Sequence, residues 1–282
     1  MEWAFTSLRG TDILKEKNGE ALEMRQYVVD AFTDKVFGGN PAAVCVLEVW
    51  PDEEFMQSLA MENNLSETAF AVKEGARYGL RWFTPGGEVE LCGHATLATA
   101  FVIMNHVEPG TSAVEFSTRS GVLRVERRED LYELDLPAFS MERGEVTEEL
   151  CRAYGAVPAE VWMGADLVCV FEDEDTVRKL KPDLEAMKGL FGVVQHATAR
   201  GRDHDCVTRS FGPKCAVAED PVCGRGHCHV APYWAARLGK EEIRAFQASA
   251  RGGELWCRSV GERVKIAGKA VLFALSEVFA AE

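Results

Sequence analysis

One pattern of residues occurs twice in the chain, and it limits the possible folds more than any other feature. The first copy consists of Phe83-Thr84-Pro85, Glu90 and Cys92-Gly93-His94-Ala95. The second copy consists of Phe211-Gly212-Pro213, Asp220 and Cys223-Gly224-Arg225-Gly226. The order is the same and the copies lie about half a chain apart, so the pattern predicts a duplicated domain. A helix is expected to begin at each Cys-Gly pair, so two helix N-termini should face one another across a cleft.

Such helix ends have a definite chemistry. The first turn of a helix has free N–H groups and a positive dipole end, which stabilise carboxylates, enolates and thiolates. Glycine lets a ligand approach the backbone closely. Two helix ends aimed into one pocket would hold an anionic intermediate from both sides. We therefore expect the backbone around Gly93, Gly224 and Gly226 to bind an anionic substrate.

Strands and helices alternate along the rest of the chain. The central helices are expected over residues 93–105 and 226–238, with shorter helices after Pro51, over 147–154 and over 174–180. Strands are expected over residues 28–33, 42–47, 68–72, 80–83, 167–171, 192–196 and 206–211, with three more strands before residue 136 and a hairpin at Gly252-Gly253. Pro137 and Gly144 mark a domain boundary between the halves.

The composition argues against two classes of partner. The chain has 45 acidic and 31 basic residues, a net charge of −14 at pH 7, which repels nucleic acids and anionic lipids. The longest apolar run, residues 95–104, has half of the about 20 residues that a spanning helix needs. We expect neither a nucleic acid nor a membrane as partner. The nine cysteines, without a secretory signal, indicate reduced thiols in the cytoplasm.

Four residues that can bind metals crowd into one short segment: Cys223, His227, Cys228 and His229. Their spacing does not match a structural zinc motif, which needs a second C-x2-C or H-x3-H element. The C-x-x-C motif of a redox pair and the Lys-Ser/Thr of a phosphate-binding P-loop are also missing. We therefore expect no metal and no nucleotide here.

Glu67 is a candidate for acid–base chemistry. It follows the polar residues 63–66 and precedes an apolar strand, so its carboxyl group should lie at a strand edge beside buried surface. A carboxyl group in such a place can act as a proton shuttle near neutrality. The residues alone favour a solvated acid at Glu67, and a helix cap or a satisfied core group at His94 and at Asp220.

Several segments, taken together, resemble the PhzF family, the phenazine-biosynthesis-like isomerases with the diaminopimelate epimerase fold. They are VDAFTDKVFGGNPAAV, NNLSETAF, RWFTP, ELCGHATLA, the Arg209–Pro213 stretch and EDPVCGRGHCHVAPYW. The resemblance implies an isomerase without a cofactor, of the α/β (α+β) class. Its two similar halves would each be a curved mixed sheet around a central helix. A homodimer is typical of the family.

The resemblance also implies domain boundaries. It begins near Met24, so residues 1–23 are expected to be an N-terminal extension. The N-terminal domain should cover residues 24–138 together with about 270–282. The C-terminal domain should cover residues 139–269.

The resemblance assigns roles to three residues. The family's catalytic glutamate falls on Glu67, its helix-end histidine on His94 and its second-half aspartate on Asp220. Glu67 would move a proton between carbons of a small, amino-acid-like carboxylate, while His94 and Asp220 would orient the substrate and share protons.

The sequence departs from the family pattern at the second helix, where the usual Thr-Gly-Ser is Cys223-Gly224-Arg225. Arg225 brings a permanent cation in place of a small hydroxyl group. It would either bind a substrate carboxylate or turn outward to balance Glu219.

Cys92 and Cys223 allow an alternative reaction. Epimerases of the same fold use one cysteine from each half, each in a Cys-Gly pair at a helix N-terminus, where the thiolate is favoured. A racemase or epimerase that uses Cys92 and Cys223 is therefore one alternative, although His94-Ala95-Thr96 follows in the manner of the isomerases. A non-catalytic metabolite-binding or interaction module of the same fold is another.

Overall fold

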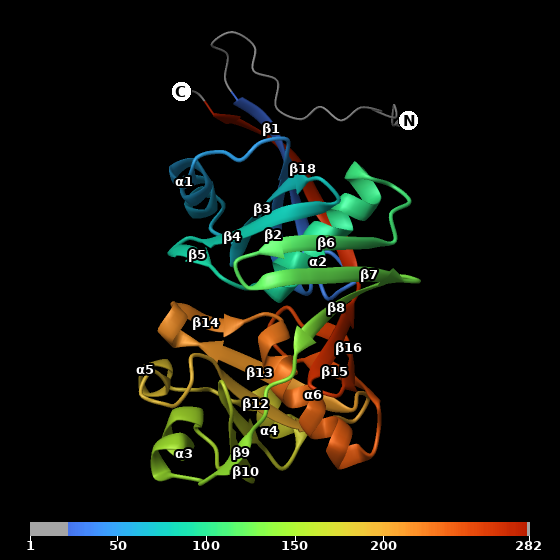
Figure 1. The fold of residues 1–282 in the computed structure, drawn as a ribbon. Coiled ribbons are helices and arrows are strands. Elements are labelled where there is room, and N and C mark those ends of the chain that lie inside the picture. Colours follow the sequence, from blue (N-terminus) through green and yellow to red (C-terminus); the bar gives the residue numbers. More distant parts are fainter. Residues whose placement is uncertain (1–21, 281–282) are drawn as a thin grey trace, which may run out of the picture.

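The structure is a computed structural model that describes residues 22–280. Within this range the chain forms two halves, each a curved sheet wrapped around one central helix (Figure 1). The predicted extension over residues 1–23 lies outside the described residues, except for its last two positions, which begin the first strand.

The main sheet of the first half contains eight strands. In spatial order they are β18 (Ala270–Ala280), β1 (Leu22–Ala31), β2 (Asn40–Leu47), β3 (Glu67–Glu74), β4 (Arg77–Thr84), β6 (Ala113–Thr118), β7 (Gly121–Arg128) and β8 (Leu131–Pro137). The pairs β2–β3 and β4–β6 are parallel and the others are antiparallel. A short strand, β5 (Gly87–Val89), pairs with the end of β4.

The second half repeats this arrangement. Its strands are β9 (Glu142–Gly144), β10 (Glu160–Met163), β11 (Leu167–Val170), β12 (Gln195–Arg200), β13 (Cys206–Gly212), β15 (Glu242–Gln247), β16 (Gly253–Val260) and β17 (Arg263–Gly268). The pairs β11–β12 and β13–β15 are parallel, and the short β14 (Val217–Asp220) pairs with β13. Strand order and directions therefore match those of the first half, which confirms the predicted duplicated α/β fold.

The two sheets are joined through equivalent strands. β8 and β17 pair antiparallel, with Leu134 opposite Ile266. The chain then crosses over: β9 follows β8 into the second sheet, and β18 follows β17 back into the first. Each sheet therefore ends in a strand that follows, along the chain, the last strand of the other sheet. The halves cannot separate without losing the β8–β17, β9–β10 or β1–β18 pairing.

Each sheet surrounds one central helix, α2 (Gly93–Val102) or α6 (Gly224–Leu238). α2 continues as a π-helical turn over Ile103–Val107. Nearly every residue of α2 is buried, which its small and apolar sequence allows. Both predicted central helices are confirmed, although α6 begins two residues earlier than expected. No helix within residues 22–280 is long and apolar enough to cross a bilayer.

The remaining helices connect strands at the periphery. They are α1 (Glu53–Asn63), α3 (Glu148–Tyr154), α4 (Glu174–Lys179) and α5 (Leu184–Met187), and a 3-10 turn covers Pro213–Cys215. Asp or Thr side chains cap the N-terminus of all four helices by accepting a backbone N–H bond. α1 ends at Asn64, whose left-handed φ of 48° turns the chain toward β3.

α6 contains a proline that the sequence analysis did not consider. Pro232 has no N–H group, so the Cys228 carbonyl oxygen loses its helical partner. The backbone N–H of Phe139 donates to this oxygen instead, at 3.1 Å. Phe139 lies on the segment that crosses from β8 to β9, so the proline creates a bond that ties the crossover to the central helix.

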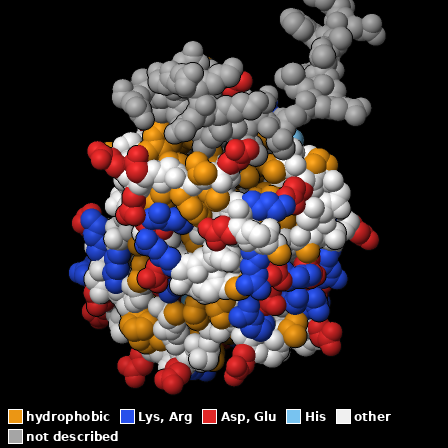
Figure 2. Space-filling model, turned by 45° about the horizontal axis from the view of Figure 1, so that its top comes forward, with side chains coloured by type: hydrophobic (Ala, Val, Ile, Leu, Met, Phe, Trp, Pro, Cys, Tyr) orange, Lys and Arg blue, Asp and Glu red, His pale blue; other side chains and the backbone are white. Residues whose placement is uncertain are grey.

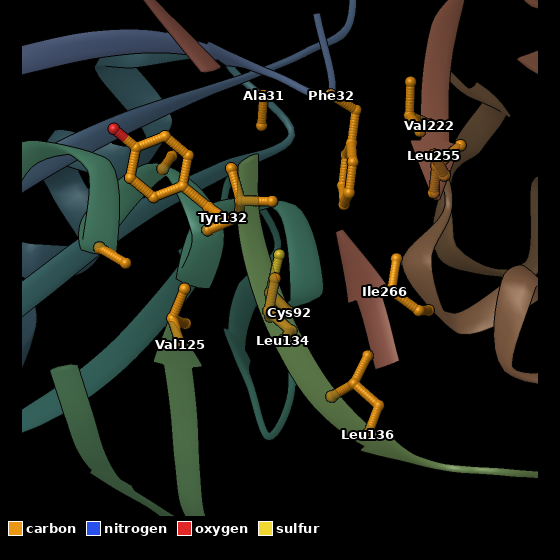
Figure 3. Packing of buried hydrophobic residues seen from close by; sticks show 14 of the residues in the cluster. Ala31, Phe32, Cys92, Val125, Tyr132, Leu134, Leu136, Val222, Leu255 and Ile266 are labelled. Atoms are coloured by element: carbon orange, nitrogen blue, oxygen red, sulfur yellow. The ribbon is translucent and has the colours of Figure 1, made fainter. Parts of the chain in front are cut away.

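The core is continuous between the halves. Phe32, at the end of β1, lies between Cys92 and Leu134 of the first half and Val222, Leu255 and Ile266 of the second (Figure 3). Its ring fills the space above Gly268 in β17, where an added β-carbon would lie 2.3 Å from the ring's Cδ1. Only glycine fits there, because the ring is fixed by residues of both sheets.

Gly268→Ala is therefore expected to destabilise the protein by about 1–3 kcal/mol, because the new methyl group must displace a fully packed ring. Urea unfolding measures the change. Gly86→Ala is the matched control: its β-carbon would lie 3.6 Å from Thr84 Oγ1, an ordinary contact, so its effect should stay within about 0.5 kcal/mol. Equal unfolding midpoints for the two variants would contradict the packing argument.

Candidate active site

The N-termini of the two central helices meet directly. A β-carbon built on Gly93, the first residue of α2, would lie 3.8 Å from the Gly224 Cα, and one built on Gly224 would lie 3.8 Å from the Gly93 Cα. Gly224 is the first residue of α6. The predicted encounter of two helix ends is confirmed.

Glu67 and His94 come together at this place. Glu67 is the first residue of β3 and His94 the second residue of α2. Glu67 Oε2 lies 3.0 Å from His94 Nε2, and the two side chains are 17% and 7% exposed. The strand start and the helix start thus bring a carboxylate and an imidazole to contact distance, with the carboxylate nearer to solvent.

Asp220 joins the same group through Asn40. Asn40 begins β2, and its Nδ2 donates to Asp220 Oδ1 at 2.8 Å and to the Val222 carbonyl oxygen at 3.1 Å. The same nitrogen lies 3.2 Å from His94 Nδ1. An amide has only two hydrogens, and the two acceptors use both. Asn40 therefore binds Asp220 and the Val222 carbonyl group of the second half, and its nitrogen lies beside His94 of the first half without a hydrogen left for it.

Asn40 is a site residue that the sequence analysis missed. Gly38-Gly39-Asn40-Pro41 belongs to one of the segments that resemble the PhzF family, but no role was assigned to Asn40. The signal available was an asparagine directly before a buried strand. Its partners lie more than fifty positions away along the chain, so only the fold reveals its role.

The charges in the group influence one another. Burial disfavours a charged His94, but the neighbouring Cys92 and Glu67 groups favour it, and the pKa of His94 lies well above its ordinary value. Desolvation raises the pKa of Asp220; His94 opposes this shift and Glu67 adds to it. An imidazolium between two carboxyl groups is the arrangement that these directions describe.

Both cysteines are present at the helix ends but as neutral thiols. Burial raises the pKa of Cys92 to about 11, and the Glu67 charge adds to the rise. Burial, with Asp220 nearby, raises the pKa of Cys223 well above its ordinary value. Cys223 Sγ accepts a bond from the Gly226 N–H at 3.3 Å, and Cys92 Sγ lies 3.5 Å from His94 Nδ1. The lowered thiol pKa that the two-cysteine alternative requires is therefore lacking.

Arg225 occupies the position in α6 that His94 has in α2. Its Nε donates to Asp166 Oδ2 at 2.5 Å, and its guanidinium group lies over the Phe139 ring, 5.2 Å from the centroid. The alternative in which Arg225 balances Glu219 is wrong, because Glu219 pairs with Arg209 at 2.7 Å. The arginine side chain is longer than the serine that is usual at this position, so it can bond to Asp166, which precedes β11.

The glycines at this helix differ in what they do. Gly224 allows the contact with Gly93. Gly226 is required by packing, since its added β-carbon would lie 2.8 Å from His196 Nδ1 and 3.2 Å from Ser210 Oγ. Its N–H group is already used by Cys223.

The crowded cysteines and histidines of α6 do not converge. His227 Nδ1 contacts the Cys223 carbonyl oxygen at 2.7 Å, and Cys228 Sγ contacts the Gly224 carbonyl oxygen at 3.5 Å. Within residues 22–280, two other sets bring three donor atoms close enough to share an ion. One is Glu67, Cys92 and His94; the other is Asp166, His196 and His229.

Comparisons with known proteins agree with this arrangement. The model of the family described as "Phenazine biosynthesis-like protein" matches residues 29–275. A protein named as an uncharacterized isomerase from Pseudomonas aeruginosa is 48% identical over 252 residues, which cover 89% of this chain and 97% of the relative.

Solved structures give the same answer. A PhzF-family phenazine biosynthesis protein from Enterococcus faecalis has 49% identity and a TM-score of 0.89, covering 91% of this chain and 99% of the other. A hydroxyproline epimerase from Agrobacterium vitis shares only the fold: its identity is 10% and its TM-score 0.61, over 92% of this chain and 93% of the other. The chain therefore belongs to the phenazine biosynthesis-like (PhzF) family and is an isomerase with the epimerase-like fold.

Proposed function

We propose that this isomerase moves a proton on a small, carboxylate-bearing, amino-acid-like metabolite, with Glu67 as general acid and base. The observation that carries the proposal is the 3.0 Å contact between Glu67 and His94 beside the meeting helix ends. A carboxylate supports proton transfer when a titratable partner lies within hydrogen-bond reach and the surroundings can hold the negative charge that develops.

The proposed reaction has two steps. The Glu67 carboxylate takes a proton from a carbon atom of the substrate, and the electron pair left behind is delocalised toward the substrate carboxylate. N–H groups near Gly93 and Gly224 stabilise this anion, whereas the Gly226 N–H, which was also expected to take part, is bonded to Cys223 Sγ. Glu67 then returns the proton to a different carbon atom. Because the electron pair stays with the substrate and Glu67 gives back one proton for the one it takes, the reaction needs no oxidant, reductant or cofactor.

His94 and Asp220 support Glu67 in this proposal. His94, whose Nε2 lies 3.0 Å from Glu67 Oε2, can donate to a substrate oxygen. Asp220 holds its place through Asn40, whose amide group also faces His94. Asp220 can therefore influence His94 through its charge as the substrate proton moves.

Arg225 is proposed to bind the substrate carboxylate. Only its Nε is bonded to Asp166, and among the described residues its terminal nitrogens have no hydrogen-bond partner. The side chain is 41% exposed, so a ligand can reach it. Asp166 and Phe139 hold the guanidinium plane in one orientation, which favours a two-point contact with a carboxylate.

Glu67→Gln is expected to lower proton exchange by about 10²–10⁴-fold, because glutamine cannot take up a proton. A panel of cyclic and acyclic amino acids and related carboxylates is first screened for thermal stabilisation of the protein. Each stabilising compound is then incubated in D2O, and deuterium incorporation is followed by NMR.

Two further variants decide between the mechanisms. Cys92→Ala and Cys223→Ala are expected to retain deuterium incorporation. The two-cysteine alternative predicts the opposite: both cysteine variants lose deuterium incorporation and Glu67→Gln retains it. Glu90→Gln, an exposed carboxylate in the same segment as Cys92, is the control. If no compound of the panel exchanges with the wild-type protein, the non-catalytic alternative is favoured.

The Asp220 carboxylate is expected to support activity while it lowers the free energy of unfolding. Its pKa is raised in the folded protein, mainly by desolvation. At a pH above this folded-state pKa, the carboxylate is less favourable in the folded chain than in the unfolded chain. Asp220→Asn is therefore expected to raise the free energy of unfolding at pH 8 while lowering exchange activity. The gain should shrink as the pH falls through the folded-state pKa and vanish when both states are protonated.

Urea unfolding at a series of pH values measures this effect. Asp175→Asn is the control of opposite sign, because the hydrogen bond and charge of Arg202 lower the pKa of Asp175. That variant should show no gain at pH 8. A loss of stability for Asp220→Asn at pH 8 would contradict the argument.

We further propose that the protein acts in small-molecule biosynthesis in the cytoplasm and forms a homodimer. β18 pairs on one side with β1, and no described strand pairs with its other side. Phe273, Leu275 and Phe279 are exposed along it at alternate positions. On the face drawn in Figure 2, apolar side chains are likewise exposed among interspersed acidic and basic ones. An apolar edge strand supports association with a second copy.

Leu275→Glu is expected to shift the protein from dimer to monomer in sedimentation velocity, since a charge would enter the contact. Val260→Glu replaces an apolar residue that is also exposed, in β16, and should leave the dimer intact. A monomeric wild-type protein at micromolar concentration would refute the proposal.

A further inference from the structure

The second half contains buried polar residues where the first half has alanines. Equivalent positions follow from the strand registers. Phe83 lies opposite Thr68, and its counterpart Phe211 lies opposite Gln195. Ala69, the residue after Thr68, therefore corresponds to His196.

Two more positions are identified in the same way. Ala43 pairs with Thr68 and Leu167 pairs with Gln195, so Ala42 corresponds to Asp166. The repeat of Cys92 and Cys223 makes Ala98 the counterpart of His229. Asp166, His196 and His229 are each 0% exposed, as are the three alanines. Burying three titratable side chains in place of methyl groups is costly unless their polar atoms are paired.

The three side chains converge. One carboxylate oxygen and one ring nitrogen from each histidine all lie within 4.8 Å of one another. His196 Nε2 and Asp166 Oδ2 are 3.8 Å apart, too far for a hydrogen bond between them. Their separation fits atoms that share an ion, which can draw them slightly together.

Outer contacts fix the other polar atom of each side chain. Ser210 Oγ lies 2.9 Å from His196 Nδ1, and the Arg225 carbonyl oxygen lies 3.2 Å from His229 Nδ1. The N–H groups of Val193 and Val194 donate to Asp166 Oδ1 at 3.0 and 3.2 Å. Such contacts orient the ligands of protein metal sites.

This arrangement leaves one atom without a partner. His196 Nε2 is fully buried and has no hydrogen bond within the described residues. Since His196 Nδ1 is held by Ser210, the free nitrogen is directed at Asp166. An unpartnered buried nitrogen beside a buried carboxylate is what a bound cation would satisfy.

We propose that Asp166, His196 and His229 bind a divalent transition-metal ion of the Zn²⁺ type. Neutral imidazole nitrogens and a carboxylate oxygen suit this class of ion. The ion would tie together the start of β11, strand β12 and helix α6. The sequence analysis considered His229 only with the cysteines beside it, and therefore missed this set.

Without the ion, other groups of the chain contact the ligand atoms. Arg225 Nε donates to Asp166 Oδ2 at 2.5 Å, and the Asp166 N–H donates to His229 Nε2 at 3.2 Å. The Arg225 side chain is 41% exposed and can turn outward. A metal ion therefore competes with the guanidinium group for Asp166, and it must also displace the Asp166 N–H from His229 Nε2, which has a single lone pair. Metal binding removes the contact that orients Arg225, so it should weaken the binding of a substrate carboxylate if the proposed function holds.

The test titrates the chelator-treated, full-length protein with Zn²⁺ by calorimetry and with Co²⁺ by absorption. The wild-type protein is expected to bind one equivalent. The Co²⁺ complex should show d–d bands without a thiolate charge-transfer band, which distinguishes this site from the nine cysteines. His196→Ala should no longer bind the one equivalent of metal ion, and Ser210→Ala should bind Zn²⁺ about 10–100-fold more weakly.

Arg225→Gln makes the test independent of whether His196→Ala folds. Removing the competing cation should tighten Zn²⁺ binding and enlarge the thermal stabilisation by Zn²⁺. His204→Ala, which removes a histidine that contacts Glu254, should bind as the wild type does. Three results would overturn the proposal: no bound equivalent in both the wild type and Arg225→Gln, unchanged binding in a folded His196→Ala, or a thiolate charge-transfer band.

Discussion

The contact between Gly93 and Gly224 is the constraint on which the rest of the site depends. Two helix N-termini repel one another, because each carries the positive end of a helix dipole. The two first residues come so close that a β-carbon added to either would lie 3.8 Å, an ordinary contact distance, from the Cα of the other. The cost is offset by the joined sheets around them, whose β8–β17 pairing and common core hold the halves together. The potential at this point is therefore positive before any side chain contributes.

The duplication explains why the site has two different sides. At the second helical position, the first half has His94 and the second has Arg225. His94 turns to Glu67, the first residue of β3. Arg225 turns to Asp166, just before β11. The first half thus contributes the titratable pair Glu67 and His94 near the two helix ends. The second half contributes the permanent charge of Arg225, which is bonded to Asp166. This division suits a reaction in which one side moves the proton and the other holds the substrate.

The sequence was sufficient for features that repeat or that follow local rules. The echo of the two Cys-Gly pairs predicted the duplicated fold and the encounter of the helix ends. The positions of Glu67 and His94 at a strand start and a helix start were also predictable. Asn40 and Asp166 were not, because each acts through partners far away along the chain. Their roles depend on strand register, which a single sequence does not determine.

The thiols show where local reasoning fails for a physical reason. A cysteine at a helix N-terminus is expected to be acidic, since the helix end favours a thiolate. Here the same closeness that makes the helix ends useful also excludes water from Cys92 and Cys223. Desolvation is the larger effect, and the pKa of each thiol rises.

Cys223 nevertheless has a structural role that needs no charge. Its sulfur accepts the Gly226 N–H, the contact that a threonine hydroxyl would make as a helix cap. A neutral cap satisfies one N–H group and leaves the net positive potential of the helix end in place. A thiolate would cancel that potential. A buried, neutral cysteine therefore fits a site in which the helix ends serve the substrate's negative charge, and in which Glu67, the more exposed member of the Glu67–His94 pair, handles the proton.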